Sequence, residues 1–379
     1  MRVRQRLVWL CPEFTPYHEA FFDAVAAEGH FDLCVYVMMD TTRTHPFVSR
    51  GSRPYEWHLA RNARRRIDPE VLRRLAQERS DAWFLVASYR PVTLAAAMYA
   101  LARQRRPFLY WTDTPLPETT QWNSREPEAR PWWLRFARRQ LLHWIYAHAH
   151  RILATGDFGV AASIKLGCPP EKCLVFPYWV PLGDAPARLR DTDPAPLRTL
   201  VGIGQLIHRK GWEFALQAVA DARRQGAEVE LILIGDGAER RLLEDQAVAF
   251  GLADKVRFPG WLHAPEIARH LRMADALIHP ARWEPYGVVV LEAMAAGVPV
   301  LGSEACGAAV DRVVPEISGF LHAVGDVTTL TRQIVRLAND AALLQRMRVG
   351  ARESAEAWPI QRGIDLLKQL TSAGRPDGR

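Results

Sequence analysis

Residues 283–301 read WEPYGVVVLEAMAAGVPVL, and this stretch decides how the second half of the chain is interpreted. Glu284 and Glu292 stand eight residues apart, which at first suggests one face of a helix. Pro285 and Gly287 break such a helix, because proline restricts the residue before it to extended geometry and glycine permits a tight turn. The sequence therefore predicts a loop that carries Glu284, followed by a buried helix that carries Glu292 in its second turn.

The start of this predicted helix is a candidate anion site. A helix N-terminus offers unpaired N–H groups and the positive end of the helix dipole, which suit a phosphate. A loop acid, the N–H groups of Gly287 to Val289 and a helix acid together suit a sugar nucleotide, which carries hydroxyls at both ends and a diphosphate between them. The alternative is a buried helix whose Glu292 binds neighbouring backbone.

Short apolar or β-branched runs alternate with longer amphipathic runs on both sides of this stretch. Such alternation predicts βαβ units and parallel sheets, with ligands in a crevice at the carboxyl ends of the strands. The predicted strands are residues 6–11, 31–39, 82–87, 107–113, 150–155, 199–204, 229–237, 255–260, 275–280 and 298–303. The predicted helices are residues 18–29, 92–104, 131–147, 212–226, 238–251, 264–274 and 288–297, followed by long terminal helices.

The chain has 379 residues, too many for one ordinary core, and its alternation restarts after a proline-rich stretch. The fold class is therefore α/β with two successive Rossmann-like domains. The predicted segments are an N-terminal domain over 1–180, a linker over 181–197, a C-terminal domain over 198–358 and a last helical segment over 359–379.

The positive charge of the chain is confined to its first half. Residues 1–197 carry 27 Lys and Arg against 20 Asp and Glu, whereas residues 198–379 carry 22 of each, so the first half holds all of the formal +7. This asymmetry suggests an anionic ligand, a membrane surface or a nucleic acid near that half; solvated helix faces are the alternative, since Arg64–Arg66 and Arg103–Arg106 fall at expected loops or helix ends. The absence of a recognisable RNA or DNA module disfavours nucleic acid.

Composition also bears on the compartment. The five cysteines include no C-x-x-C pair, which favours reduced thiols without a disulfide or zinc framework. The first apolar run is too short for a signal peptide, and no apolar stretch approaches the roughly 20 residues that span a bilayer. We therefore expect a cytosolic protein.

Residues 130–151, RPWWLRFARRQLLHWIYAHAHR, are aromatic, basic and amphipathic. Such a segment can lie on an anionic membrane surface, which would place the protein peripherally at the inner face of a membrane. The favoured alternative is a crossover helix that packs Trp133, Leu134, Leu141 and Ile145 into the core, because a helix is required between the two flanking strands anyway.

Residues 201–216, VGIGQLIHRKGWEFAL, place Arg209 and Lys210 directly before a predicted helix. Two cations beside a helix N-terminus suit a diphosphate and the charge that develops on a departing nucleotide. The alternative is an exposed basic turn. The glycines of this stretch do not fit a dinucleotide fingerprint, and the nearby LIGDG of residues 233–237 is a weak signal of a tight turn.

Six segments occur in the order GQLIHRKG, IGDGAERRLLE, VRFPGWL, EPYGVVVLEAMAAGVPVLGS, CGAAVDRV and SGFLHAVGDVTTL. Together they resemble the donor domain of a family 4 glycosyltransferase over roughly residues 200–340. The resemblance implies the GT-B fold, with two parallel sheets facing across a cleft and a last helix that crosses back to the first domain. It implies a nucleotide-sugar donor, retention at the anomeric carbon, and transfer without a metal or other cofactor. The D-x-D at residues 191–193 is therefore not expected to bind metal.

The resemblance also assigns roles to residues. By position, Glu284 is the first acid of the family's E-x7-E signature and would contact the donor sugar, Glu292 would hold the ribose hydroxyls and Lys210 would bind the diphosphate. The backbone amides expected to face the sugar and phosphates are those of Tyr286, Gly287, Val288 and Val289. The residues expected at the base are Gly260, Trp261 and Leu262.

The chain departs from the family at three places. Gln205 stands where an arginine is common, which leaves Arg209 as the substitute cation. The N-terminal domain lacks a Gly-Gly loop, and His18 would approach the phosphates instead; an ordinary helix N-terminal residue is the alternative. Asp113 or Thr114 stands where many members have a histidine, and would bind a sugar hydroxyl, assist the acceptor or simply cap a turn.

The resulting functional hypothesis is a retaining glycosyltransferase. It would move a sugar from a UDP- or GDP-sugar to a hydroxyl acceptor, either lipid-linked or anionic, in cell-surface polysaccharide, glycolipid or secondary-metabolite biosynthesis. The alternatives are an epimerase or phosphorylase of the same fold, or a non-catalytic nucleotide-sugar-binding subunit.

Overall fold

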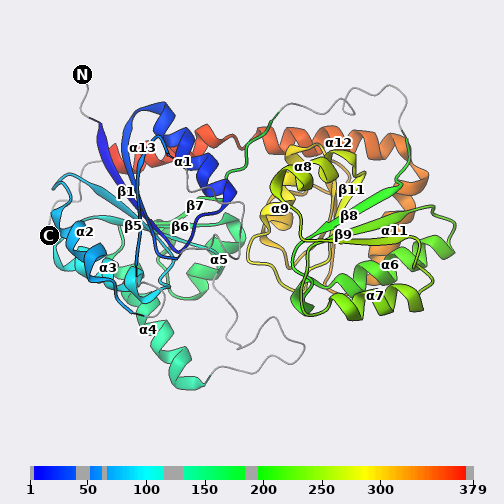
Figure 1. The fold of residues 1–379 in the computed structure, drawn as a ribbon, viewed down its shortest axis with the longest axis horizontal. Helices are drawn as coiled ribbons and strands as arrows, with labels where there is room; N and C mark the ends of the chain where they lie inside the picture. Colours follow the sequence, from blue (N-terminus) through cyan, green and yellow to red (C-terminus); the bar gives the residue numbers. More distant parts are fainter. Residues whose placement is uncertain (1–3, 40–51, 62–65, 115–130, 184–194, 373–379) are drawn as a thin grey trace. The chain divides into compact units, whose positions relative to one another are not determined.

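The computed structural model describes residues 4–39, 52–61, 66–114, 131–183 and 195–372. It divides into two compact units, shown in Figure 1. The described part of unit 1 comprises residues up to 114, 131–181 and 359–372; that of unit 2 comprises residues 182–183 and 195–358. Most of the predicted linker, its D-x-D and the Arg64–Arg65 pair lie outside the described residues.

Unit 1 is a seven-stranded parallel sheet in the order β3-β2-β1-β4-β5-β6-β7, with helices on both faces. Its strands are β1 (Gln5–Cys11), β2 (Phe31–Val37), β3 (Glu56–Leu59), β4 (Trp83–Ala87), β5 (Phe108–Thr112), β6 (Arg151–Ala154) and β7 (Cys173–Val175). Its helices are α1 (Pro16–Glu28), α2 (Pro69–Gln77), α3 (Val92–Arg103), α4 (Trp132–His148), α5 (Gly156–Lys165), the short 3-10 helix η1 (Pro170–Lys172) and α13 (Ile360–Ser372).

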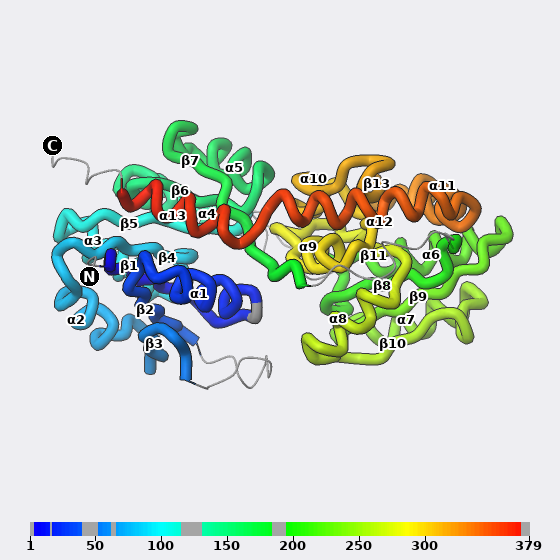
Figure 2. The backbone as a smooth tube through the Cα atoms, turned by 90° about the horizontal axis from the view of Figure 1, so that it is seen from above, coloured from blue at the N-terminus to red at the C-terminus, as the bar shows by residue number. Residues whose placement is uncertain are grey.

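The sequence of unit 1 accounts for its central layer. Leu7 to Cys11 of β1 are all buried, as expected for a parallel strand covered on both faces. The first helix begins two residues earlier than predicted, because the Thr15 hydroxyl accepts a hydrogen bond from the His18 amide at 3.3 Å and caps it. The C-terminal α13 packs against α1 (Figure 2), and Gly363 leaves room there for the Trp179 indole.

Unit 2 is a six-stranded parallel sheet in the order β10-β9-β8-β11-β12-β13. Its strands are β8 (Thr199–Ile203), β9 (Glu230–Ile234), β10 (Val256–Gly260), β11 (Ala276–His279), β12 (Val300–Ser303) and β13 (Gly319–His322). Its helices are η3 (His208–Lys210), α6 (Trp212–Arg224), α7 (Arg240–Ala249), α8 (Ala264–Met273), α9 (Val288–Ala295), α10 (Gly307–Arg312), α11 (Val327–Asn339) and α12 (Ala341–Glu356).

In both units the strand order reverses next to the first strand, which is the doubly wound arrangement. The α/β class with two parallel Rossmann-like sheets is therefore as predicted. In unit 2 the reversal lies between β8 and β11, so the carboxyl ends of these two strands are where a ligand is expected. The loops that leave them carry Arg209, Lys210 and Glu284.

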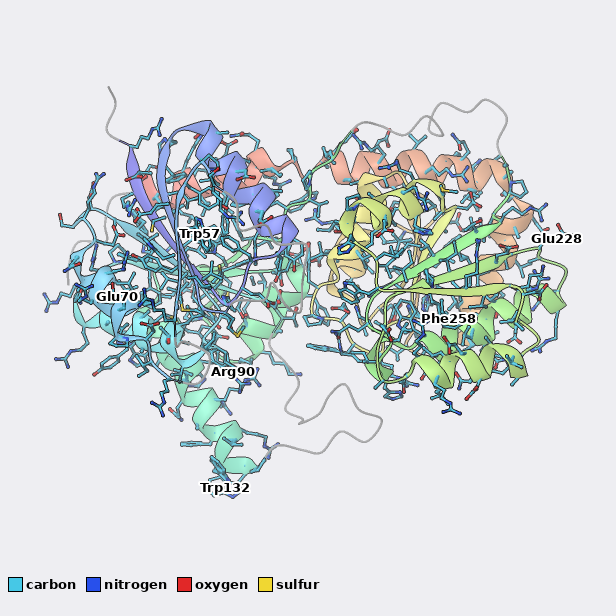
Figure 3. The ribbon with its side chains drawn as sticks, in the orientation of Figure 1. Trp57, Glu70, Arg90, Trp132, Glu228 and Phe258 are labelled. Carbon is cyan, nitrogen blue, oxygen red and sulfur yellow. The ribbon has the colours of Figure 1, made fainter. Side chains whose placement is uncertain are left out.

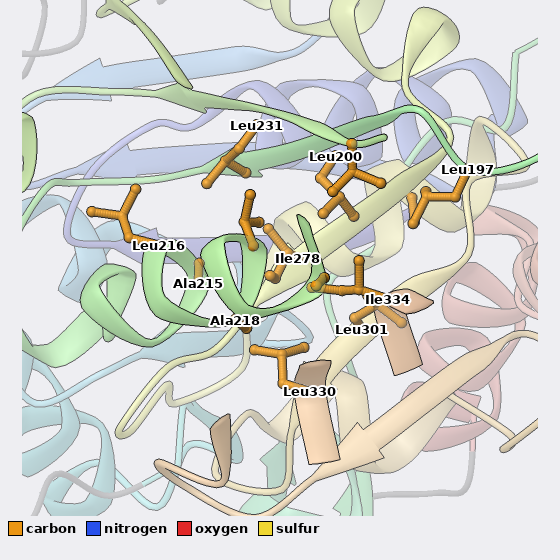
Figure 4. Close-up of a cluster of buried hydrophobic side chains, with 14 of the residues drawn as sticks. Leu197, Leu200, Ala215, Leu216, Ala218, Leu231, Ile278, Leu301, Leu330 and Ile334 are labelled. Carbon is orange, nitrogen blue, oxygen red and sulfur yellow. The ribbon is translucent and has the colours of Figure 1, made fainter. Parts of the chain in front are cut away.

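The core of unit 2 fixes these two strands in place. Figure 4 shows Leu200 of β8 and Ile278 of β11 packed in one cluster with leucines of the neighbouring strands and with side chains of α6 and α11. On the same sheet, Asp275 precedes β11 and accepts hydrogen bonds from the amides of Arg198 and Thr199 at 2.9 and 2.8 Å. Its other oxygen pairs with buried Arg348 of α12 at 2.7 Å. This pair anchors α12 to the central strands.

Six strands and α-helices of the described chain were absent from the prediction: β3, β7, β13, α2, α5 and α10. The three strands among them have only three or four residues, and each lies at an edge of its sheet, so none has the longer apolar run of a central strand.

The prediction that Trp133 and Leu134 belong to the core was wrong. They are 56% and 41% exposed, and only the second half of α4, which includes buried Ile145 and half-buried Leu141, lies against the sheet. None of the described helices is both long and apolar enough to span a bilayer.

The Arg348–Asp275 pair supports a stability prediction. Arg348→Ala should lower the free energy of unfolding by about 3–5 kcal/mol, because it leaves a buried carboxylate without its cation. Arg346→Ala, an exposed position on the same helix, should change it by less than about 0.5 kcal/mol. Urea unfolding measures both, and equal effects would show that the buried pair contributes nothing specific.

Candidate functional site

The loop after β11 and the start of α9 form the centre of the candidate site in unit 2. Gly287 caps α9 in the left-handed region, with φ 94°. Two backbone hydrogen bonds hold this loop against the segment that follows β12. The Glu284 amide donates to the Ala305 carbonyl at 2.8 Å, and the Ala308 amide donates to the Tyr286 carbonyl at 2.7 Å. Glu284 therefore sits in a fixed loop, and Glu292 sits on the helix behind it.

Gly287 is required here for two reasons. Its positive φ is costly for any residue with a Cβ. A Cβ at this position would also lie 2.8 Å from the Cys306 sulfur and 3.1 Å from Cγ of Glu284. The glycine thus lets the backbone turn within contact distance of the loop acid.

Glu284 is buried and surrounded by cations. Its Oε2 pairs with Arg209 Nη1 at 2.9 Å and with Lys210 Nζ, and it lies 3.8 Å from His279 Nε2. Burial by itself would raise the pKa of Glu284, but the charges of Lys210 and Arg209 and the His279 contact hold it well below its usual range. Two cations around one carboxylate leave a net positive charge at the site.

Both cations come from η3, which follows β8. Arg209 also donates to the Trp283 carbonyl at 3.0 Å, so it joins the two loops. Lys210 lies against Gly204, where a Cβ would approach its Nζ to 3.4 Å. The predicted basic turn is therefore buried, which disfavours the alternative of an exposed turn.

The backbone at the start of α9 offers free donors. The amides of Gly287, Val288 and Val289 donate to no acceptor within the described residues, whereas Val290 donates to the Gly287 carbonyl at 3.0 Å. These three residues are partly exposed. Unpaired amides at a helix N-terminus attract an anion, and the surplus cation beside them has the same effect.

Glu292 has the opposite environment from Glu284. Its carboxylate forms no ion pair or hydrogen bond with any described residue, although the side chain is only partly exposed. Burial raises its pKa to about 7. The alternative in which Glu292 binds neighbouring backbone is therefore not what the structure shows, and the carboxylate is available to a ligand.

The remaining predicted donor residues lie at the carboxyl ends of β8 and β10. Gln205 is exposed, and its carbonyl accepts from the Trp212 indole at 2.9 Å. Gly260 ends β10 with φ 83°, Trp261 is 44% exposed and Leu262 is partly buried.

The LIGDG stretch of residues 233–237 lies where two turns of the backbone pack closely together. A Cβ on Gly235 would lie 2.0 Å from the Gly204 carbonyl oxygen, so the turns after β8 and β9 meet there.

Two buried histidines were missed by the sequence analysis. His279 ends β11 beside Glu284; burial and the charge of Lys210 lower its pKa, and neither ring nitrogen has a hydrogen-bond partner in the described chain. His322 ends β13, and burial lowers its pKa to about 4. The signal that could have found them is a histidine at the last position of each strand.

His18 and Asp113 belong to unit 1, where they lie near one another. The His18 ring is buried between Phe22 and Trp111, and burial lowers its pKa to about 4, so the imidazole is neutral near pH 7. Asp113 is exposed at the end of β5 and accepts from the Tyr178 hydroxyl at 3.1 Å. The Tyr178 ring also lies 5.9 Å from His18, whereas Thr114 is buried. His18 is thus a buried residue in the first turn of α1, packed among aromatic rings.

Comparison with known proteins agrees with this geometry. Residues 193–354 match the family model of glycosyl transferases group 1. This segment contains every candidate donor residue of unit 2. The predicted resemblance to this group is confirmed for that segment.

Several curated proteins are similar to part of the chain. The chain is 32% identical over 165 residues to the 2-deoxystreptamine glucosyltransferase of Streptomyces kanamyceticus, covering 43% of this chain and 42% of that protein. It is 30% identical over 211 residues to the GDP-mannose-dependent alpha-(1-6)-phosphatidylinositol monomannoside mannosyltransferase of Mycolicibacterium smegmatis, covering 53% and 54%. The matched segments thus span only about half of these relatives or less.

Solved structures match nearly the whole chain. A complex of HepE from Anabaena with UDP has a TM-score of 0.74 at 18% identity, covering 98% of this chain and all of that one. The fold is GT-B. Sucrose-phosphate synthase from Thermosynechococcus elongatus gives a TM-score of 0.73 at 20% identity, covering 98% of this chain and all of that one. At these identities the likeness establishes the fold alone.

Glu292 gives this site a pH signature in stability. Its pKa rises from 4.5 to about 7 on folding, so between these values the folded chain binds more protons than the unfolded chain, and stability falls as pH rises. Glu292→Gln cannot ionise, so at pH 8 it should be more stable than the wild type by on the order of 1–3 kcal/mol, with no gain at pH 4. Unfolding at both pH values measures this.

Exposed Glu353→Gln is the control and should change stability equally little at either pH. A gain for Glu292→Gln that is the same at pH 4 and pH 8 would contradict the assignment, because it would not come from ionisation.

Proposed function

We propose that this chain is a glycosyltransferase that moves a sugar from a nucleotide-sugar donor to a hydroxyl acceptor. The observation that carries the proposal is the arrangement at α9: a net positive cluster of Arg209, Lys210 and Glu284 beside three free backbone amides, with the unpaired Glu292 one turn along the helix. The match of this segment to glycosyl transferases group 1 supports it.

The donor diphosphate would occupy the free amides and the surplus positive charge. As the bond between sugar and diphosphate breaks, negative charge develops on the leaving oxygen, and Lys210 and Arg209 would stabilise it. Because Glu284 already holds both cations in place, they need not reorganise when the charge appears. Glu284 is ionised and accepts hydrogen bonds only, so it would bind hydroxyls of the donor sugar.

Glu292 would accept hydrogen bonds from the ribose hydroxyls. A carboxylate without protein partners can use both oxygens for a ligand, and hydroxyl donors would favour its ionised form. The base would lie near Gly260, Trp261 and Leu262 at the end of β10. HepE structures with UDP and with UDP-glucose, and the GDP-mannose dependence named for a relative, support a UDP- or GDP-sugar.

We further propose that the transfer needs no metal and retains configuration. Arg209, Lys210 and the α9 amides supply the positive charge that a metal ion would otherwise provide to the diphosphate. Asp113 and neutral His18 of unit 1 are the proposed contacts to a sugar hydroxyl, the acceptor or the phosphates. The acceptor is proposed to be a hydroxyl compound of cell-surface polysaccharide, glycolipid or secondary-metabolite synthesis.

Substitution at the donor site tests the proposal. A thermal-shift screen of nucleotide sugars first identifies a ligand, since specific binding raises apparent stability. Lys210→Ala should then lower turnover by about 100-fold or more, because it removes a preorganised cation. Glu292→Ala should weaken donor binding about tenfold or more, because it removes charge-assisted hydrogen bonds.

Arg241→Ala, an exposed position on α7, is the matched control and should leave both quantities unchanged. Unchanged turnover in both site variants would refute the site. Nucleotide release that does not require an acceptor would favour an epimerase, a phosphorylase or simple hydrolysis over transfer.

The proposal that configuration is retained is tested by a separate measurement. The anomeric configuration of the purified product, determined by NMR from the coupling of the anomeric proton, should equal that of the donor. An inverted product would overturn retention while leaving glycosyl transfer intact.

A further inference from the structure

Most of the N-terminal half of α4 is exposed in the described structure. Trp132, Trp133, Leu134 and Phe136 are 72%, 56%, 41% and 58% exposed. Figure 3 shows Trp132 at the end of the helix that projects beyond the rest of unit 1. Single exposed apolar side chains are ordinary on protein surfaces. Here four exposed apolar side chains, three of them aromatic, fall within five residues, and such clusters are typical of interaction sites.

The helix carries apolar residues on two opposite faces. The second half buries Leu142, Ile145 and Tyr146 against the sheet. At about 100° per residue, Trp133 and Phe136 lie on the other side of the helix, and Trp132 lies at the boundary between the two sides. No rotation of α4 can bury both groups in one core. Trp133 and Phe136 therefore have no place in the core of unit 1.

A further exposed aromatic ring lies on the neighbouring helix α3. The Trp144 ring of α4 lies 5.8 Å from the ring of Tyr99 on α3, and Tyr99 is 55% exposed. Arg103 is exposed one turn further along α3. Both helices thus expose an aromatic ring with an arginine nearby.

The charge of the projecting segment, residues 132–139, is entirely positive. It contains Arg135, Arg138 and Arg139 and no acidic residue, and Arg138 donates to the Tyr89 hydroxyl at 3.1 Å. Cations in the first turns of a helix oppose its dipole, and Pro131 at the N-cap supplies no side-chain hydrogen bond. This composition weakens the isolated helix end, so it is explained better by a partner than by helix stability.

We propose that the projecting segment of α4 docks on an anionic lipid bilayer. Trp132, Trp133 and Phe136 would enter the boundary between headgroups and acyl chains, and the arginines would lie against lipid phosphates while their stems cover apolar surface. A bilayer is favoured over a protein groove by charge: residues 1–197 hold all of the formal +7 of the chain, an asymmetry that attracts an extended anionic surface. This inference concerns where the protein works and does not depend on its donor.

Vesicle co-sedimentation of the full chain tests the inference. We expect binding to vesicles of phosphatidylcholine with phosphatidylglycerol, much weaker binding to phosphatidylcholine alone, and a loss of binding as salt rises. The triple variant Trp132→Ser, Trp133→Ser and Phe136→Ser should bind at least about tenfold more weakly. Arg135→Gln and Arg139→Gln should each weaken binding about fivefold.

The matched control removes equally exposed apolar side chains from unit 2. Val248 and Met273 are 64% and 65% exposed, and their change to Ser should leave vesicle binding unaltered. All variants should keep the melting temperature and nucleotide-sugar affinity of the wild type, which separates a folding or donor-site defect from a docking defect.

Two results would overturn the inference. One is failure of the wild type to bind phosphatidylglycerol vesicles, or equal binding by the triple variant. The other is a wild-type dimer in light scattering that the triple variant dissociates without any effect on vesicle binding, since the face would then belong to a second copy of the chain.

Discussion

The site in unit 2 depends on one buried carboxylate held by two cations. Removing Glu284, Arg209 and Lys210 from water costs several kcal/mol for each ion, and their attraction repays this only when the geometry is close and fixed. The fold provides that geometry from two directions. The switch point of the sheet brings the η3 loop and the β11–α9 loop together, and the connection after β12 pins the latter through backbone hydrogen bonds. Gly287 then lets α9 begin within contact distance of the acid.

The two acids of the nine-residue stretch 284–292 have opposite properties. Glu284 is ionised by its neighbours, whereas Glu292 has no partner and its pKa rises to about 7. Pairs of acids with divergent pKa values are typical of functional sites, because stability alone would select a paired or an apolar residue at a buried position. The unpaired acid can bind hydroxyls, and the free amides and surplus positive charge beside it can bind phosphates, so a ligand that carries both groups fits the whole arrangement. The arrangement is therefore better explained by a nucleotide sugar than by a ligand that has only hydroxyls or only phosphates.

The features predictable from sequence were those with local causes. Pro285, Gly287 and the apolar run after them place Glu284 in a loop and Glu292 on a helix, whatever the rest of the chain does. Central strands such as β1 are recognised by their uninterrupted apolar residues. The Arg209–Glu284 pair joins residues 75 positions apart, so predicting it would have required the strand order of the sheet as well. His279 was missed because its position at the end of a strand is a weak signal until its distance from Glu284 is known. The short edge strands β3 and β7 were missed because pairing with a neighbour, and not their own pattern, makes them strands.

The error at α4 has a geometric cause. A helix of 17 residues is about 26 Å long, whereas the five-residue strand β5 beside it spans about 16 Å, so roughly a third of the helix must extend past the sheet. Amphipathic analysis assumes that every apolar residue on such a helix has a core to enter. In the overhanging part there is none, and polar residues would satisfy the fold equally well. The presence there of Trp132, Trp133 and Phe136 among arginines is therefore information about a surface outside the molecule, which no argument from core packing can supply.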